Sequence, residues 1–408
     1  MALPTIRVEV GFDLSNDPNA AFFRLDDATQ GRLDNTTYRL AGVLFYDVTE
    51  HVSAVTVNRG KQITDTNYQP GECEIQFNNH NRWFDPLYTA SPYNGNIVPR
   101  REVKIFANDI EMYRGWIDDW DLTYSNDGDS ISIAKAFDAI QILNTRYVFP
   151  TYTPVEELSG ARINAVLDLP EIAWPSGLRQ IDAGQATIAA NPITEPVSAL
   201  EYLQIIASSE PGDTYVTRDG KFAFIDRVKA PSSASFVEFS DNDISFDNLN
   251  VSYGAELLFN EVVMTRQGGG TATASEPASI ELYGYRTLNI TDSQVSTDAQ
   301  LADIALSYVS KYSRPTYRFD AMDIYLHKLS PENQNRVLAL DFGDICKVVF
   351  TPNGIGDPIE QFVEVINIDH NIDVEQHTVT LGFSEIVAAA LRLDDAIFGK
   401  LDENVLAG

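Results

Sequence analysis

The sequence is poor in cysteine and in positive charge. Only Cys73 and Cys346 occur among 408 residues, which excludes a disulfide framework and a zinc site built from cysteines. Against 29 Lys and Arg residues stand 59 Asp and Glu, so the net charge is −30. A surface of that sign repels nucleic-acid phosphates, and we expect no specific nucleic-acid binding.

Long apolar runs are missing as well. No run approaches the roughly 20 residues of a membrane helix, so no membrane-spanning segment is expected. The first ten residues alternate apolar and polar, without the basic start and apolar block of a secretion signal. We therefore expect the protein to be made and folded in a cytoplasm.

Strand signals dominate what is present. Period-two alternation predicts strands in the first third of the chain, over 6–12, 52–57, 73–77, 103–106, 111–124 and 130–134. The last two flank Ser125–Gly128, a turn signature that contains Asp-Gly. We expect an antiparallel β-domain over 1–145, with an arm at 13–43.

The middle of the chain has a different pattern. Apolar spacing predicts helices over 161–169 and about 197–208, and Asp219-Gly220 predicts a hairpin turn. These signals define a small α/β insert domain over 146–230.

The second half returns to strands and is predicted to form a second β-domain over 231–388. It contains the clearest helix, 297–312, with Thr297 as its N-cap. Gln267–Ser275 is rich in glycine and small residues and is interpreted as a flexible linker or loop tip. A C-terminal arm over 389–408 follows.

A short repeat links the two arms. Arg24–Asp34 and Arg392–Asp402 are identical at eight of eleven positions, at a constant spacing of 368 residues. Such acidic segments form no core alone, but their leucines can dock on a partner with the carboxylates outward. The candidate interaction residues are Leu25, Asp26, Asp27, Leu33, Asp34, Leu393, Asp394, Asp395, Leu401 and Asp402.

A second, weaker repeat spans the β-domains. The segment 113–140 and the segment 362–387 each consist of a strand, a turn, a strand and a short apolar end. Each follows a strand with a central lysine, Lys104 or Lys347. We interpret the chain as two duplicated β-domains around an α/β insert.

Several motifs resemble the minor tail proteins of siphoviruses that infect actinobacteria, and the later half resembles the baseplate hub fold of long-tailed phages. The resemblance covers most of the chain and rests on Val57–Lys61, Tyr68–Glu72, Asn78–Arg82, Phe84–Pro86, Ile97–Val103, Gly115–Trp120, both Leu-Asp-Asp copies, Gly343-Asp344 and Ile366–His370.

This resemblance implies a mainly β (α+β) fold with two antiparallel β-barrel or sandwich domains like those of tail-tube protein, assembled as a ring-shaped homotrimer. It further implies a structural protein of the virion, at the phage tail tip, that adapts a sixfold tube to a threefold tip. The implied partners are the distal tail protein, the tape measure protein and other tail-tip or fibre proteins, and DNA would pass through the channel.

Candidate catalytic and ligand-binding motifs are weak. We identify no catalytic residues, no cofactor site and no metal site. His370 and His377 with Glu375 lack a third convincing metal ligand and are interpreted as surface polar residues. Trp116 and Trp120, four apart on one strand, are predicted to share a face, as barrel core or as a sugar-binding platform.

Three other functions remain open at this stage. One is a distal tail protein that forms a hexameric ring, which differs from a hub in oligomeric state. Another is a carbohydrate-binding adsorption protein, which would bind glycans or cell wall. The last is a cell-wall hydrolase, which zymography would reveal.

Overall fold

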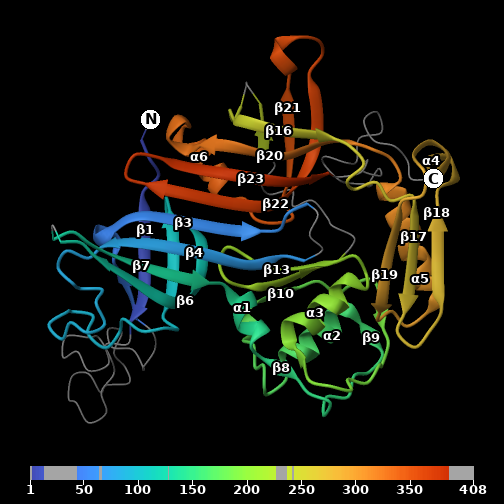
Figure 1. The fold of residues 1–408 in the computed structure, drawn as a ribbon, viewed down its shortest axis with the longest axis horizontal. Coiled ribbons are helices and arrows are strands. Elements are labelled where there is room, and N and C mark those ends of the chain that lie inside the picture. Colours follow the sequence, from blue (N-terminus) through green and yellow to red (C-terminus); the bar gives the residue numbers. More distant parts are fainter. Residues whose placement is uncertain are drawn as a thin grey trace, which may run out of the picture.

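The computed structural model describes residues 2–12, 44–63, 67–126, 128–226, 237–240 and 243–385. Within these ranges, no helix combines the length and the apolar composition needed to cross a membrane. The described chain consists of two β-units, one above the other, with an α/β insert and a small α/β module beside them (Figure 1).

The first β-unit is an antiparallel sheet from the N-terminal third of the chain. Its strands are β1 (Ile6–Phe12), β2 (Leu44–Asp47), β3 (Val52–Gly60), β4 (Gln69–Asn78), β5 (Glu102–Ala107), β6 (Ile110–Tyr124) and β7 (Ser130–Phe137). They lie in the order β3-β4-β7-β6-β5-β1-β2. Alternate residues are buried, as in β4, where Cys73, Ile75 and Phe77 face the core.

The second β-unit comes from the last third of the chain. It consists of β15 (Val237–Phe239), β16 (Asp247–Tyr253), β20 (Tyr317–Tyr325), α6 (Pro331–Leu338), β21 (Ile345–Phe350), β22 (Ile359–Asp373) and β23 (His377–Glu385). Its strand order is β16-β20-β23-β22-β21-β15. Strand β22 also pairs with β3, so the two units share one sheet.

The two β-units repeat one strand arrangement. The order β3-β4-β7-β6-β5 in the first matches β16-β20-β23-β22-β21 in the second, with every neighbouring pair antiparallel. Their central strands, β6 and β22, are both 15 residues long. Each has a bulge at the same place, after Ile117 and after Val365.

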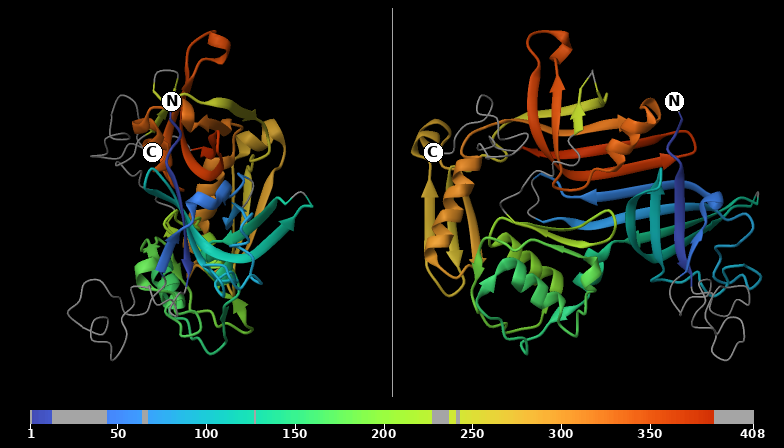
Figure 2. Two further views of the ribbon diagram at one scale, coloured as in Figure 1. Left: turned by 90° about the vertical axis from the view of Figure 1, so that its left-hand side faces the viewer. Right: turned by 180° about the vertical axis from the view of Figure 1, so that it is seen from behind.

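The insert lies below the sheets and is built on three helices (Figure 2). Its elements are α1 (Ala139–Asn144), β8 (Tyr147–Val148), β9 (Glu157–Leu158), α2 (Ser159–Leu167), β10 (Arg179–Ile181), β11 (Thr187–Ile188), β12 (Val197–Ser198), α3 (Ala199–Ser208), β13 (Asp213–Val216) and β14 (Phe222–Ile225). The Ser198 side chain caps α3 by accepting from the Glu201 N–H at 3.1 Å. Strands β13 and β14 form the predicted hairpin, with Gly220 at a positive φ of 81°.

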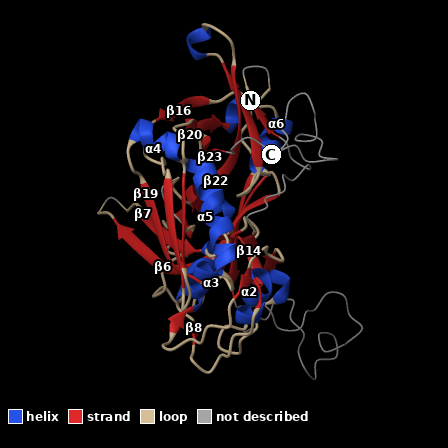
Figure 3. Cartoon of the chain, turned by 90° about the vertical axis from the view of Figure 1, so that its right-hand side faces the viewer, coloured by secondary structure: helices blue, strands red, loops and turns tan. Residues whose placement is uncertain are grey.

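A small module is inserted between β16 and β20. It comprises β17 (Glu261–Arg266), β18 (Thr271–Ser275), α4 (Pro277–Tyr283), β19 (Thr287–Ser293) and α5 (Asp298–Tyr312). Helix α5 begins after the predicted cap Thr297 and lies along the three-stranded sheet (Figure 3). Its stripe of Leu301, Ile304, Ala305 and Val309 forms a separate core with Val262, Met264, Val295 and Ala186.

Of the two interpretations of Gln267–Ser275, the loop tip is correct for residues 267–270, which form a hairpin turn. The linker is wrong, because Thr271–Ser275 forms β18 and pairs with β17. Gly268, at a positive φ of 68°, lies in the turn of that hairpin. The alternation of Thr and Ala in β18, rather than the preceding glycines, was the informative signal.

The predicted fold class is confirmed: the described protein is mainly β, with antiparallel sheets and an α/β insert. The domain boundaries remain predictions. The arms at 13–43 and 389–408, and with them all ten candidate interaction residues, lie outside the described residues.

Candidate assembly surfaces

A buried arginine connects the two β-units and the insert. Arg59, at the end of β3, is 4% exposed. One of its terminal nitrogens donates to the Val216 carbonyl of β13 at 2.8 Å and to the Asp341 carboxylate at 3.0 Å. Its guanidinium lies 4.6 Å from the centre of the Phe342 ring. One side chain therefore contacts all three parts.

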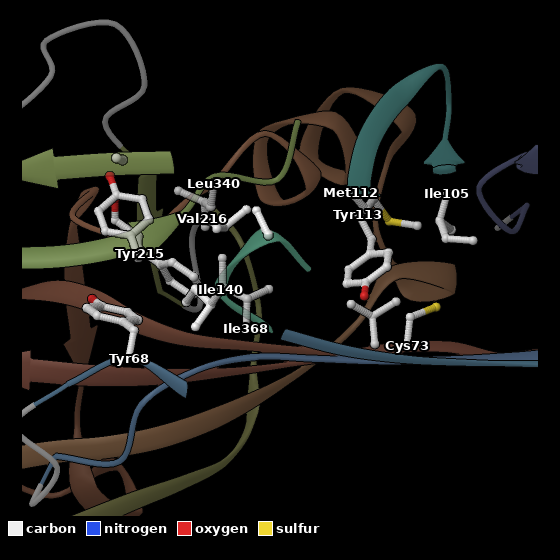
Figure 4. Close-up of a cluster of buried hydrophobic side chains, with 14 of the residues drawn as sticks. Tyr68, Cys73, Ile105, Met112, Tyr113, Ile140, Tyr215, Val216, Leu340 and Ile368 are labelled. Carbon is white, nitrogen blue, oxygen red and sulfur yellow. The ribbon is translucent and has the colours of Figure 1, made fainter. Parts of the chain in front are cut away.

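Aromatic side chains pack at this junction, and Figure 4 shows two of them, Tyr68 and Tyr215, within a cluster of buried hydrophobic residues. Tyr68 lies 5.4 Å from Tyr215 and 4.9 Å from Phe342, ring centre to ring centre. The Tyr215 hydroxyl donates to the Phe342 carbonyl at 3.1 Å. Burial raises the pKa of Tyr68 well above its ordinary value, so it stays a neutral phenol. The junction combines these rings with two ion pairs, Arg59–Asp341 and Lys61–Asp213, which hold the parts in a fixed arrangement.

Backbone pairing provides the second connection between the β-units. The second half of β22 runs antiparallel to β3, with Asn367 opposite Gly60 and Asp373 opposite Ala54. The Lys61 N–H donates to the carbonyl of the bulged residue Ile366 at 3.0 Å. This ladder is therefore an interface between the two β-units within one chain.

Strand β16 and the second half of β6 each have an edge without such a partner among the described strands. Strand β16 pairs only with β20, and β6 pairs with β5 only as far as Trp116. Large apolar side chains are exposed at both edges: Tyr124 is 53%, Tyr253 69% and Val251 36% exposed. Open edges with apolar side chains are typical sites for pairing with another chain.

The two tryptophans do not share a face. Trp116 pairs with Phe137 and Trp120 with Ala134, on opposite sides of β7, because the bulge after Ile117 shifts the alternation by one residue. Trp120 stacks at 6.0 Å on Phe77, inside the unit. Core packing, one of the two expected roles, therefore holds for Trp120.

The two histidines are buried, which corrects their interpretation as surface residues. His370 on β22 and His377 on β23 are 5% and 0% exposed, and His370 Nδ1 lies 3.1 Å from His377 Nε2. Burial lowers the pKa of both rings, that of His377 to about 3, so both are neutral at pH 7.

A metal site finds no support in this arrangement. Glu375 lies in the exposed turn beyond the two rings. In the part of the chain that the structure describes, no three His, Cys, Asp or Glu side chains are placed to hold a metal ion. The histidine pair instead forms a polar contact between two paired strands.

Sequence reasoning missed the role of Arg59 and the two open edges. A signal for Arg59 was present: Val55, Val57 and Arg59 alternate along β3, so the arginine faces the same buried side as the valines. A charged residue at an inward position indicates a buried partner. The open edges follow from sheet order, which the sequence does not specify.

The fold is similar to that of solved phage tail proteins. No protein-family model and no curated sequence matches the chain. Among solved structures, the tail protein from Neisseria meningitidis MC58 is similar, with a TM-score of 0.58 and 12% identity, over 84% of this chain and 94% of that one. The 43 kDa tail protein of prophage MuSo2 from Shewanella oneidensis is similar too, with a TM-score of 0.55 and 12% identity, over 94% of this chain and 97% of that one.

Proposed function

We propose that the chain is the baseplate hub of a long-tailed phage, a structural, non-enzymatic protein of the virion tail tip. The observation that carries this proposal is the repeated strand arrangement of the two β-units. The shared fold of phage tail proteins supports it. Three copies with two units each present six similar units, which is what a connection between a sixfold tube and a threefold tip requires.

The repeat also favours a hub over the alternatives. A hexameric distal ring reaches sixfold symmetry with one unit per copy, whereas this chain has two. For a carbohydrate-binding protein, the expected platform of Trp116 and Trp120 is not formed. A cell-wall hydrolase has no supporting group of residues in the described part of the chain.

The net negative charge would allow DNA to pass through a central channel without binding to its wall. With −30 on each copy, a trimer carries −90, and the part that lines a central channel repels the phosphates of passing DNA. The arms are proposed to contact the distal tail protein, the tape measure protein or fibre proteins through Leu25, Leu33, Leu393 and Leu401.

Native mass measurement of the purified chain, together with electron microscopy of the particles, tests the proposal. We expect a ring of three copies with six similar lobes. Six copies in a ring would indicate a distal tail protein, and a monomer at high concentration would contradict the hub function. Glycan binding or clearing in zymography by a monomer would favour the adsorption protein or the hydrolase.

A further inference from the structure

A small pocket lies where the two β-units and the module around α5 meet. Its walls are formed by the two connections between the second β-unit and the module, 254–258 and 311–318, together with Ile63 after β3 and the end of β23. Its volume of about 20 Å³ is room for one small polar group. We call it the basic pocket, because of the cations that line it.

The charge of this pocket is opposite to that of the whole chain. Lys311, Arg314 and Arg318 line it, and Glu385 is the one carboxylate among the lining residues. Three positive charges against one negative charge leave +2, in a chain whose net charge is −30. A local surplus of positive charge in an acidic protein favours the binding of an anionic group.

Two of the three cations have no ion-pair partner. Lys311 and Arg314 form no ion pair within the part of the chain that the structure describes. The Lys311 ammonium lies instead 5.1 Å from the centre of the neighbouring Tyr312 ring. Both positive charges are therefore available to an anion that enters the pocket.

The third cation is buried and poorly neutralised. Arg318 is 3% exposed, and its Nε and one terminal nitrogen donate to the Ser252 hydroxyl at 3.3 and 3.2 Å. Its nearest carboxylate oxygen belongs to Glu256, at 3.5 Å, and the Glu256 side chain is 62% exposed. A buried guanidinium with one long ion pair gains from a further anion beside it.

We propose that the basic pocket binds the carboxylates of Asp394 and Asp395 of the same copy and so anchors the C-terminal arm. Glu385, the last described residue, belongs to the pocket wall, so the chain continues towards the arm from the pocket itself. Asp394 and Asp395 are the first carboxylates after Glu385. The eight residues between, 386–393, can span about 26 Å when extended, which is enough to turn back to the pocket.

Two further arguments favour this occupant. Half-buried Ile63 and Leu257 belong to the pocket wall, and Leu391, three positions before Asp394, could cover them while the carboxylates face the cations. A segment of the same chain also reaches the pocket at a high effective concentration. Leu393 and Leu401 take no part in this contact and stay available to the proposed tail partners.

Carbodiimide cross-linking of the full-length chain tests the contact. The reagent activates a carboxyl group, and a lysine amine in direct contact displaces it to form an amide. We expect an amide between Lys311 and Asp394 or Asp395, identified by mass spectrometry of the peptides, in a product that remains a single chain on a denaturing gel.

Two matched controls accompany this experiment. Lys328 and Asp247, 3.1 Å apart with both side chains about half exposed, form an ion pair that should cross-link in every sample. Lys311→Arg keeps the positive charge but has no amine to form the amide, so its peptides should lack the product.

The results that would overturn the proposal are distinct. A cross-linked control without any product of Lys311 would show that no carboxylate of the arm binds in the pocket. A product of Lys311 with Glu385 alone would show that the pocket is neutralised by its own wall. Covalent dimers through Lys311 would show that the arm of another copy binds there.

Proteolysis gives a second test without chemical modification. Trypsin can cleave after Arg392 only when the arm is released, because the protease needs an extended segment. We expect Arg314→Glu to release the fragment 393–408 about ten-fold faster than the parent, since a glutamate there repels the two aspartates. Arg286→Glu, the same change at an exposed arginine of the module, should leave the rate unchanged. Equal rates for Arg314→Glu and the parent would contradict the proposal.

This contact lies within one copy and is independent of the proposed hub function. A trimer by native mass without the Lys311 product would overturn the anchoring of the arm alone. A monomer that forms the product would overturn the hub function alone.

Discussion

Arg100 and Gly343 make the same backbone contact in the two β-units. The Arg100 N–H donates to the Ile117 carbonyl at 2.6 Å, and the Gly343 N–H donates to the Val365 carbonyl at 3.0 Å. Both residues have positive φ, 69° and 83°. The acceptor in each case is the residue immediately before the bulge of the central strand. The units therefore share loop geometry as well as strand order, although the residue types differ.

The first prediction concerns this loop position. Gly343→Ala should lower the free energy of unfolding by about 1–2 kcal/mol, because a side chain disfavours positive φ and the added Cβ would lie 3.1 Å from Ile225 Cδ1. The reverse change, Arg100→Gly, removes the φ strain and should alter stability by less than about 1 kcal/mol. Denaturant unfolding of both variants checks this. A larger loss for Arg100→Gly than for Gly343→Ala would contradict it.

The second prediction concerns Arg59. Arg59→Met should destabilise the chain by about 3 kcal/mol, because it removes the cation that pairs with the Asp341 carboxylate and the side-chain donor to the Val216 carbonyl. Arg59→Lys keeps the charge but loses the forked geometry and should cost less. Chemical denaturation measures both changes. Equal stability of Arg59→Met and the parent would show that the junction does not depend on this ion pair.

The third prediction is a dependence of stability on pH. Folded His370 and His377 stay neutral while the unfolded chain takes up protons below its ordinary pKa near 6.5. Their contribution is therefore complete above about pH 6.5 and is lost as the pH falls towards the folded pKa, about 3 for His377. At pH 5 the loss is about 2 kcal/mol for each histidine.

His370→Leu tests this, since Leu122 occupies the matching position in the first unit. The variant should lose about 2 kcal/mol less than the parent between pH 8 and pH 5. Burial raises the pKa of Asp138 to about 7 and that of Asp344 to about 6, and these carboxyls act with the opposite sign. The free energy of unfolding is therefore compared between variant and parent at each pH. If both lose the same amount between pH 8 and pH 5, the pH dependence does not come from His370.

The fourth prediction concerns the two thiols. Cys73 and Cys346 are 1% and 0% exposed, and burial raises the pKa of both. Neither should react with a thiol reagent at pH 8 in the folded protein, and both should react in denaturant. Fast labelling of the native chain would contradict their burial.

The fifth prediction concerns the module around α5. Ile304→Ala should destabilise this module by about 2–5 kcal/mol, because Ile304 lies in a core separate from that of the β-units. Leu306→Ala on the same helix removes a side chain that is 60% exposed and should change stability by less than about 0.5 kcal/mol. Hydrogen exchange measures the effect: the amides of β17 and α5 should exchange faster in Ile304→Ala and at the parent's rate in Leu306→Ala. Loss of protection throughout β3 and β4 in the Ile304 variant would show that the module is not independent.

The sequence predicted the local elements well and the long-range ones poorly. The helix after Thr297 and the hairpin at Gly220 follow from capping and turn chemistry, which neighbouring residues decide. The faces of Trp116 and Trp120 could not be predicted, because one bulged residue inverts the alternation and bulges leave no clear sequence signal. The burial of His370 depends on β3 and β23, which are distant in sequence.

The ladder of β22 with β3 has a kinetic consequence. Because both strands belong to one chain, this contact forms at the high effective concentration of an intramolecular reaction and is independent of protein concentration. A ring of six separate units assembles through five bimolecular encounters and three linked pairs through two, because the last contact of each ring closes within one assembly. Linking the units in one chain thus reduces the number of encounters at which assembly can stall from five to two.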